Sequence, residues 1–340
     1  MKKTKKLLAC LIAAATMFTM GSTAFAEETG TDLPNDVATV NIFKDYICAN
    51  DETQSPAETF YLAQEEKSVE DGEATVAPDL IKLSGDENQY VAKAVFSKGG
   101  AGTRGRFAVT LPPYEKVGKY SYKLQEVDGK TAGVTYRTDT IKLVVTVING
   151  KNGALIRQVG VHTEKDGVDV KSSSFNDNKY SAGKLKVTKT VEGNLGDKTK
   201  KFHFTVKFEK PENKDVKSDI TATVAGTDKG SLALDWASGS CTYEFDLADG
   251  ETASLGNIPY DVKYTVTESD YEKDGYSIAM KTGNKGTVSA AEQTASFTNT
   301  KTGEIDTGIN LTTLPYILVF AGVIVIAGAA FITRRRKYED

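Results

Sequence analysis

Residues 183–192 read "GKLKVTKTVE", and this stretch alternates apolar and polar side chains along its whole length. A period of two is typical of a β-strand that buries one face and exposes the other. The same alternation recurs in "KKFHFTVKF" (200–208), "CTYEFDL" (241–247), "YDVKYTVTESD" (260–270) and "QTASFTNT" (293–300). We therefore expect residues 183–303 to form one all-β domain, a sandwich of short strands.

The preceding part of the chain has the same character. Alternating runs occur in "ATVNIFKDYI" (38–47), "QYVAKAVF" (89–96), "RGRFAVTL" (104–111), "GKYSYKLQEV" (118–127), "TIKLVVTVI" (140–148) and "LIRQVGV" (155–161). The small residues Ser181, Ala182 and Gly183 separate this part from the next and read as a linker. The sequence thus predicts two tandem Ig-like β-sandwich domains, over residues 27–182 and 183–303.

Composition excludes several functions. The chain has a net charge of −4 and no basic stripe, so we expect no nucleic-acid partner. Its two histidines, His162 and His203, have no neighbours at metal-ligand spacing, so we expect no metal, no cofactor and no enzymatic turnover. Cys48 and Cys241 fall in different domains, which excludes a disulfide within either domain, and the sequence assigns them no role.

Three residues of the second domain break its pattern. Lys189 takes the place of an apolar residue on the face shared by Leu185, Val187 and Val191. Glu268 follows Val262, Tyr264 and Val266 on a second inward face, and Asn299 follows Ala295 and Phe297 on a third. Each could be a strand end that reaches solvent. Three such residues in one core would otherwise cost several kcal/mol each, which calls for a chemical explanation.

An intramolecular isopeptide bond explains all three. Burial favours the neutral forms of both groups, so Lys189 can act as an amine nucleophile and Glu268 as a protonated acid beside the Asn299 amide. Glu268 then shuttles protons while the amine displaces ammonia. The patterns Leu-x-Val-x-Lys, Tyr-x-Val-Thr-Glu and Phe-Thr-Asn resemble the collagen-adhesin B-type (CnaB) domains of Gram-positive pilins, which carry this bond.

The first domain repeats the scheme, with three candidate acceptors. Lys44 shares a face with Val40 and Ile42, and Glu126 shares one with Tyr120, Tyr122 and Leu124. The segment around Glu126 resembles streptococcal-type major pilins, where this glutamate is the proton shuttle. Counting back from Leu185 selects Asn178 as acceptor, which we favour. Counting two residues on from Phe175 selects Asp177, because lysine–aspartate bonds also occur in these domains, and Asn176 stays open.

Both ends of the chain carry export signals. Residues 1–26 have a basic start, an apolar stretch and Ala24-Phe25-Ala26, and predict a cleaved signal peptide. Residues 314–333 predict a membrane-spanning helix, and the basic tail 334–340 predicts a cytoplasmic end. Just ahead of them stands the pentapeptide Glu304-Ile305-Asp306-Thr307-Gly308.

This arrangement resembles the sorting signal of Gram-positive surface proteins, and the pentapeptide resembles the Glu-Val-Pro-Thr-Gly form of major pilins, with Asp306 in place of proline. The resemblance implies cleavage between Thr307 and Gly308 by a class B or class C pilin sortase, and transfer of Thr307 to a lysine of an identical subunit. The family's spacing points to Lys171, with Lys165 as the competitor.

The resemblance also implies a location. We expect a secreted protein of the cell wall and pilus, anchored in the membrane only as a precursor. Minor tip and basal pilins, peptidoglycan and a host surface ligand are the further partners that it implies. The alternative is a monomeric wall-anchored adhesin that uses the same domains without polymerising.

Overall fold

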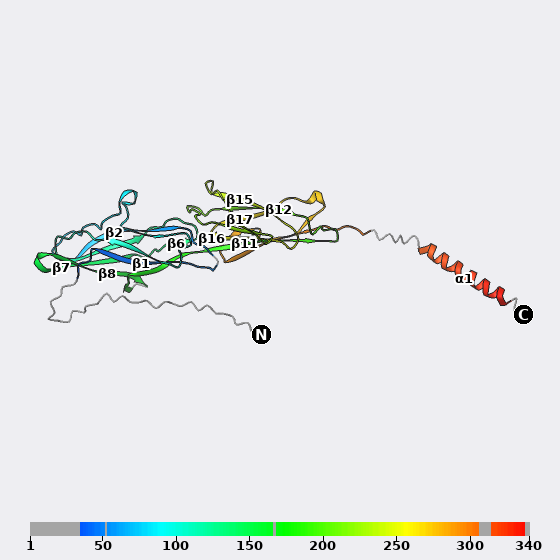
Figure 1. Ribbon diagram of the computed structural model, residues 1–340, viewed down its shortest axis with the longest axis horizontal. Helices are drawn as coiled ribbons and strands as arrows, with labels where there is room; N and C mark the ends of the chain where they lie inside the picture. The colour runs from blue at the N-terminus through cyan, green and yellow to red at the C-terminus, as the bar shows by residue number, and fades with distance from the viewer. Residues whose placement is uncertain (1–34, 52, 166–167, 306–313, 337–340) are drawn as a thin grey trace.

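The computed structural model describes residues 35–51, 53–165, 168–305 and 314–336, and its strands form two β-sandwiches arranged end to end (Figure 1). The all-β prediction is confirmed. The predicted signal peptide 1–26, residues 306–308 of the sorting motif and residues 337–340 of the tail lie outside the described residues.

The first sandwich consists of a four-stranded and a six-stranded sheet. The four-stranded sheet has the order β4-β1-β10-β6, with β1 Thr39–Cys48, β4 Arg104–Thr110, β6 Val134–Thr135 and β10 Ser174–Tyr180. The six-stranded sheet has the order β3-β2-β5-β7-β8-β9, with β2 Glu58–Gly72, β3 Ala92–Phe96, β5 Gly118–Glu126, β7 Ile141–Asn149, β8 Leu155–Lys165 and β9 Val168–Lys171. One-turn 3-10 segments lie at Gly85–Glu87 and Lys151–Gly153.

The second sandwich has the same division. Its six-stranded sheet runs β14-β13-β16-β11-β20-β18, with β11 Ala182–Glu192, β13 Thr221–Val224, β14 Thr227–Ser231, β16 Thr252–Pro259, β18 Ser277–Thr282 and β20 Glu292–Thr300. Its four-stranded sheet runs β15-β12-β17-β19, with β12 Phe202–Glu209, β15 Ser240–Leu247, β17 Lys263–Glu268 and β19 Lys285–Thr287. A 3-10 turn spans Glu272–Asp274.

In both sandwiches the first and last long strands are parallel neighbours. β1 pairs with β10 in the first domain, and β11 pairs with β20 in the second. Strands that lie side by side in parallel cannot be joined by a tight turn, so the rest of each domain connects them. A link between these two strands would therefore enclose almost the whole domain.

The C-terminal helix α1 spans Leu314–Arg336. Among the residues that the structure describes, however, no helix is both long enough and apolar enough to cross a membrane. The predicted span over 314–333 is therefore not confirmed.

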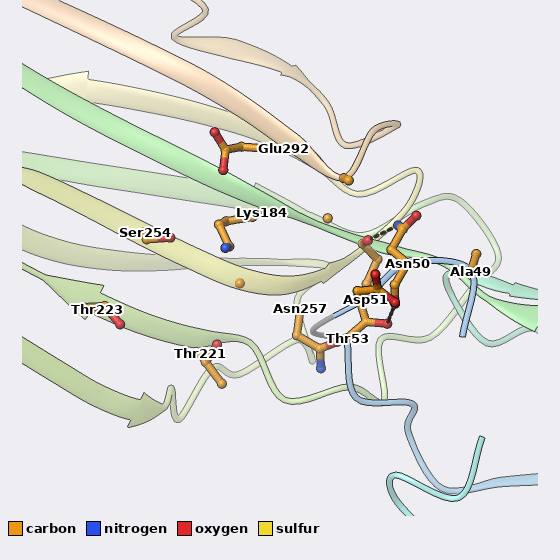
Figure 2. Close-up of a pocket in the computed structure, with 14 residues that line it drawn as sticks. Ala49, Asn50, Asp51, Thr53, Lys184, Thr221, Thr223, Ser254, Asn257 and Glu292 are labelled. Atoms are coloured by element: carbon orange, nitrogen blue, oxygen red, sulfur yellow. Dashed lines mark hydrogen bonds between the residues drawn. The ribbon is translucent and has the colours of Figure 1, made fainter. Parts of the chain in front are cut away.

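The two sandwiches meet in a hydrogen-bonded junction. The buried side chain of Asn257 accepts a hydrogen bond from the backbone N–H of Gln54 (3.1 Å) and donates to the carbonyls of Gln54 (3.0 Å) and Asp219 (2.9 Å). Asn50 donates to the carbonyl of Ala182 at 2.6 Å. Figure 2 shows Asn50 and Asn257 beside a polar pocket of about 670 Å³ at this junction.

A second contact joins the domains through the backbone. The N–H of Asp215 donates to the Lys130 carbonyl (2.8 Å), and the N–H of Ala132 donates to the Asp215 carbonyl (2.9 Å). The side chains of Glu58 and Lys217 add an ion pair at 3.2 Å. Contacts at several separate points resist bending more than a single linker would.

Asn257→Gly is expected to lower the free energy of unfolding by about 2–3 kcal/mol, because it leaves the N–H and C=O of Gln54 without their partner. Glycine is the suitable replacement because Asn257 has a φ of +58°, which alanine would adopt only with strain. Urea denaturation measures the change. The substitution Asn152→Gly is the control, since it alters another left-handed asparagine (φ +57°) that is exposed. Equal effects of the two substitutions would contradict a role for the Asn257 amide.

Candidate functional site

Each sandwich encloses a cluster of one lysine, one glutamate and one asparagine. In the second domain Lys189 lies on β11 and Asn299 on the adjacent parallel strand β20. Phe297 is the register partner of Lys189, and Asn299 is two residues further on. The lysine and the asparagine therefore point into the core from one sheet, and Glu268 reaches them from β17 of the other sheet.

The contacts in this cluster are short. Lys189 Nζ lies 2.8 Å from Glu268 Oε1, and the Asn299 amide donates to the same oxygen at 3.0 Å. Lys189 Nζ is at ion-pair distance from Glu268 but makes no hydrogen bond. Two further atoms of the cluster, Glu268 Oε2 and Asn299 Oδ1, are also buried with no hydrogen-bond partner. Buried polar atoms are rarely left unsatisfied in this way, and several at one place indicate a reactive or strained site.

Burial also changes the charge state of the lysine. Lys189 Nζ lies 4.0 Å from the centre of the Phe202 ring, and the residue is 1 % exposed. Desolvation lowers the pKa of Lys189, although the contact with Glu268 opposes the shift. The site thus favours the neutral amine more than water does.

The first domain has the same constellation in closer contact. Lys44 on β1 donates to Glu126 of β5 and, at 2.5 Å, to Asn178 Oδ1 of β10. The Asn178 amide donates to Glu126 Oε1. Lys44 Nζ lies 4.2 Å from the centre of the Phe60 ring. Desolvation lowers the pKa of Lys44 to about 8, although the contact with Glu126 opposes this shift.

The acceptor of the first domain depends on a β-bulge. Lys44 pairs with Phe175 and Tyr46 pairs with Asn178, so β10 uses three residues where β1 uses two. The extra residue shifts the inward position from 177 to 178. The structure thus brings Asn178, the favoured residue, to Lys44, while the side chains of Asn176 and Asp177 are outside the described residues.

Arg137 is a residue at this site that sequence reasoning missed. Its backbone N–H donates to Glu126 Oε1 at 3.0 Å, and its guanidinium lies 4.6 Å from the Phe175 ring centre. It follows the two-residue strand β6, where no alternation marks an inward position. An arginine between the alternating runs 118–127 and 140–148 reads as a solvated residue, so the sequence carried no signal for it.

The residues predicted for polymerisation lie on the surface. Lys171 is exposed at the end of β9, the edge strand of its sheet, and pairs in register with His162. The side chain of the competitor Lys165 is outside the described residues. Of the sorting motif, Glu304 and Ile305 are described, and Ile305 is 71 % exposed. Within the described ranges, no group of three or more His, Cys, Asp or Glu side chains could hold a metal ion.

Each of the two sandwiches matches a known family model. Residues 43–181 match the family model described as "Spy0128-like isopeptide containing domain". Residues 183–301 match a model described as a domain of unknown function, DUF7601. A curated "Pilin" of Streptococcus pyogenes serotype M1 is 28 % identical over 287 residues, which cover 78 % of this chain and 83 % of that protein. These matches support a major pilin of the streptococcal type.

Solved pilin structures have the same fold. The crystal structure of the major pilin from Streptococcus pyogenes covers 80 % of this chain and 100 % of its own, with a TM-score of 0.52 and 23 % identity. The major pilin T-13 of the same species covers 78 % of this chain and 98 % of its own, with a TM-score of 0.52 and 18 % identity. The tandem sandwich therefore has the fold of these two solved structures.

Proposed function

We propose that this chain is the shaft subunit of a covalently polymerised pilus and that each sandwich closes itself with a lysine–asparagine amide. The observation that carries the proposal is the repeated cluster, with lysine and asparagine on parallel neighbouring strands and glutamate opposite. An ordinary ion pair would need no asparagine beside it. Burying a charged lysine–glutamate pair costs free energy of folding. The same three residue types buried together in each domain therefore indicate a shared chemical purpose.

The chemistry begins with a proton transfer. Lys189 gives a proton to Glu268, and the neutral amine attacks the side-chain carbonyl carbon of Asn299. Glu268 protonates the departing nitrogen and takes the second proton from the attacking one. The Nζ–C bond forms, the C–Nδ2 bond breaks and ammonia leaves. Lys44, Glu126 and Asn178 follow the same steps, and an aspartate acceptor would release water instead.

The bonds suit a fibre that carries tension. A polymer one subunit wide loads every domain in series, so the resistance of each domain depends on its unfolding barrier. Cys48 and Cys241 are both free, so no disulfide supplies that resistance in the described chain. A link between the first and last strands of each sandwich would leave little chain to extend.

Polymerisation then joins the subunits. In this proposal a pilin sortase cleaves between Thr307 and Gly308 and transfers the Thr307 carbonyl to Lys171 of the next subunit. The exposed position of Lys171 on an edge strand supports this role, because its amine is accessible to a large acyl-enzyme. Tip and basal pilins, peptidoglycan and a host ligand would be further partners of the fibre.

Lys171→Ala is expected to abolish the ladder of SDS-resistant multimers when the protein is expressed with its sortase, because the acyl group loses its acceptor. Immunoblotting of cell-wall extracts measures the ladder. Lys165→Ala is the matched control and should leave the ladder intact. A ladder that persists in the Lys171 variant and disappears in the Lys165 variant would move the nucleophile, and a wild-type protein without any ladder would favour the monomeric adhesin.

A further inference from the structure

The two clusters differ in how their acceptors are placed. In the second domain Phe297 pairs with Lys189 and Asn299 follows two residues later, in regular β register. In the first domain Phe175 pairs with Lys44, but Asn178 follows three residues later, across the bulge. Without the bulge, the regular alternation would turn residue 177 inward, and residue 177 is an aspartate. Asp177 can also be joined to a lysine, so the bulge decides between two chemically competent acceptors.

Arg137 lies where the bulge begins. Its guanidinium covers the ring of Phe175, the last residue before the bulge, at 4.6 Å. The same group donates to the Thr163 hydroxyl on β8 (2.5 Å) and to the Asp139 carbonyl (3.0 Å), and its side chain is only 6 % exposed. These two hydrogen bonds fix the position of the guanidinium, and the Phe175 ring packs against it.

The backbone places Arg137 beside the same residues. β6 is antiparallel to β10, with Thr135 opposite Lys179, so the chain continues from Thr135 toward the bulged residues. The backbone N–H of Arg137 also donates to Glu126 Oε1, which orients the proton shuttle. One residue therefore contacts both the shuttle and the strand that supplies the acceptor. The second domain, whose β11–β20 pairing keeps a regular register, contains no arginine between residues 183 and 303.

We infer that Arg137 is a positioning residue that holds the β10 bulge through Phe175 and so selects Asn178, and not Asp177, as the partner of Lys44. The inference rests on the proposed isopeptide bond of the first domain. If the arginine is lost, the bulge can be absorbed, β10 can take the regular register, and Asp177 can enter the position of the acceptor.

The test uses the whole exported chain and locates the cross-link by intact mass and tandem mass spectrometry. Wild type should lose one ammonia in the first domain, at Asn178. Arg137→Leu keeps the backbone N–H to Glu126 and removes the guanidinium, and a measurable fraction of the chains should carry the bond at Asp177, with loss of water. Arg106→Leu is the matched control, because Arg106 is an exposed arginine on β4 of the same sheet, opposite Phe43 of β1.

Two double variants sharpen the result. Asn178→Ala alone should form no bond in the first domain, because the held bulge keeps Asp177 away from Lys44. Asn178→Ala combined with Arg137→Leu should recover a Lys44–Asp177 bond, whereas Asn178→Ala with Arg106→Leu should not.

Several outcomes would overturn the inference. They are an Arg137→Leu chain that bonds only at Asn178 at the wild-type yield, one that forms no bond at all, or a shift that Arg106→Leu produces equally. A wild-type chain with no ammonia lost in the first domain would instead remove the proposed bond itself, so the two failures are distinct.

Discussion

Asn299→Ala should leave the second domain without its bond and lower the free energy of unfolding of that domain by about 4–5 kcal/mol. A bond from Lys189 to Asn299 closes a loop of roughly 110 residues, and a cross-link of that span removes this much chain entropy from the unfolded state. The only tryptophan, Trp236, packs against the core of the second domain, so its fluorescence in a denaturant titration reports that domain alone. Compared with the mass calculated from its own sequence, the wild type should lack one ammonia from the second domain, and the variant should lack none there.

Glu268→Ala provides an independent route to the same state. It leaves both bonding partners in place but removes the proton shuttle, so the mass should again be that of the unbonded domain. Glu244→Ala is the matched control, since Glu244 is an exposed carboxylate on β15 of the same sheet. A wild-type protein that lacks no ammonia from the second domain, and an Asn299→Ala protein of equal stability, would show that the second domain never forms the bond.

In the second domain the inward positions at the site could be predicted from the sequence, because the pairings β11–β20 and β12–β17 have no register shift. The face containing Leu185 and Val187 also contains Lys189, and all three are at most 1 % exposed in the structure. The same counting placed Glu268 and Asn299 inward, and both are buried. Where the register is regular, a charged residue at an inward position breaks the apolar–polar alternation, and this break indicates the site.

The first domain shows where such counting fails. A bulge changes the phase of the alternation, and nothing within "SSSFNDNKY" says which residue is the extra one. The answer lies in contacts with Arg137, far away in the sequence, and in the register of β1. The junction was equally hidden, since Gln54 and Asn257 are separated by about two hundred residues. Long-range contacts of this kind leave no local period to read.

Asn178→Ala should make the stability of the first domain depend on pH between about 8 and 10.5. The variant keeps Lys44 buried as an amine, with a pKa of about 8 in the folded state against the ordinary 10.5 in the unfolded state. Between these values the unfolded chain binds one more proton than the folded one, so the free energy of unfolding rises with pH. Below pH 8 both states are protonated, and the full penalty of burying the charge, about 3 kcal/mol, destabilises the fold.

Far-UV circular dichroism in urea, at pH 7.5, 9 and 10, measures this effect as the difference between variant and wild type. In the wild type the Lys44 nitrogen would be an amide and cannot titrate, so the gap in stability should narrow as the pH rises. Groups common to both proteins, such as the buried tyrosines, cancel in the difference. The double variant Lys44→Met, Asn178→Ala should lose the rise. If the rise persists there, another group causes it, and if the gap stays constant in the single variant, Lys44 is not a neutral amine poised to attack.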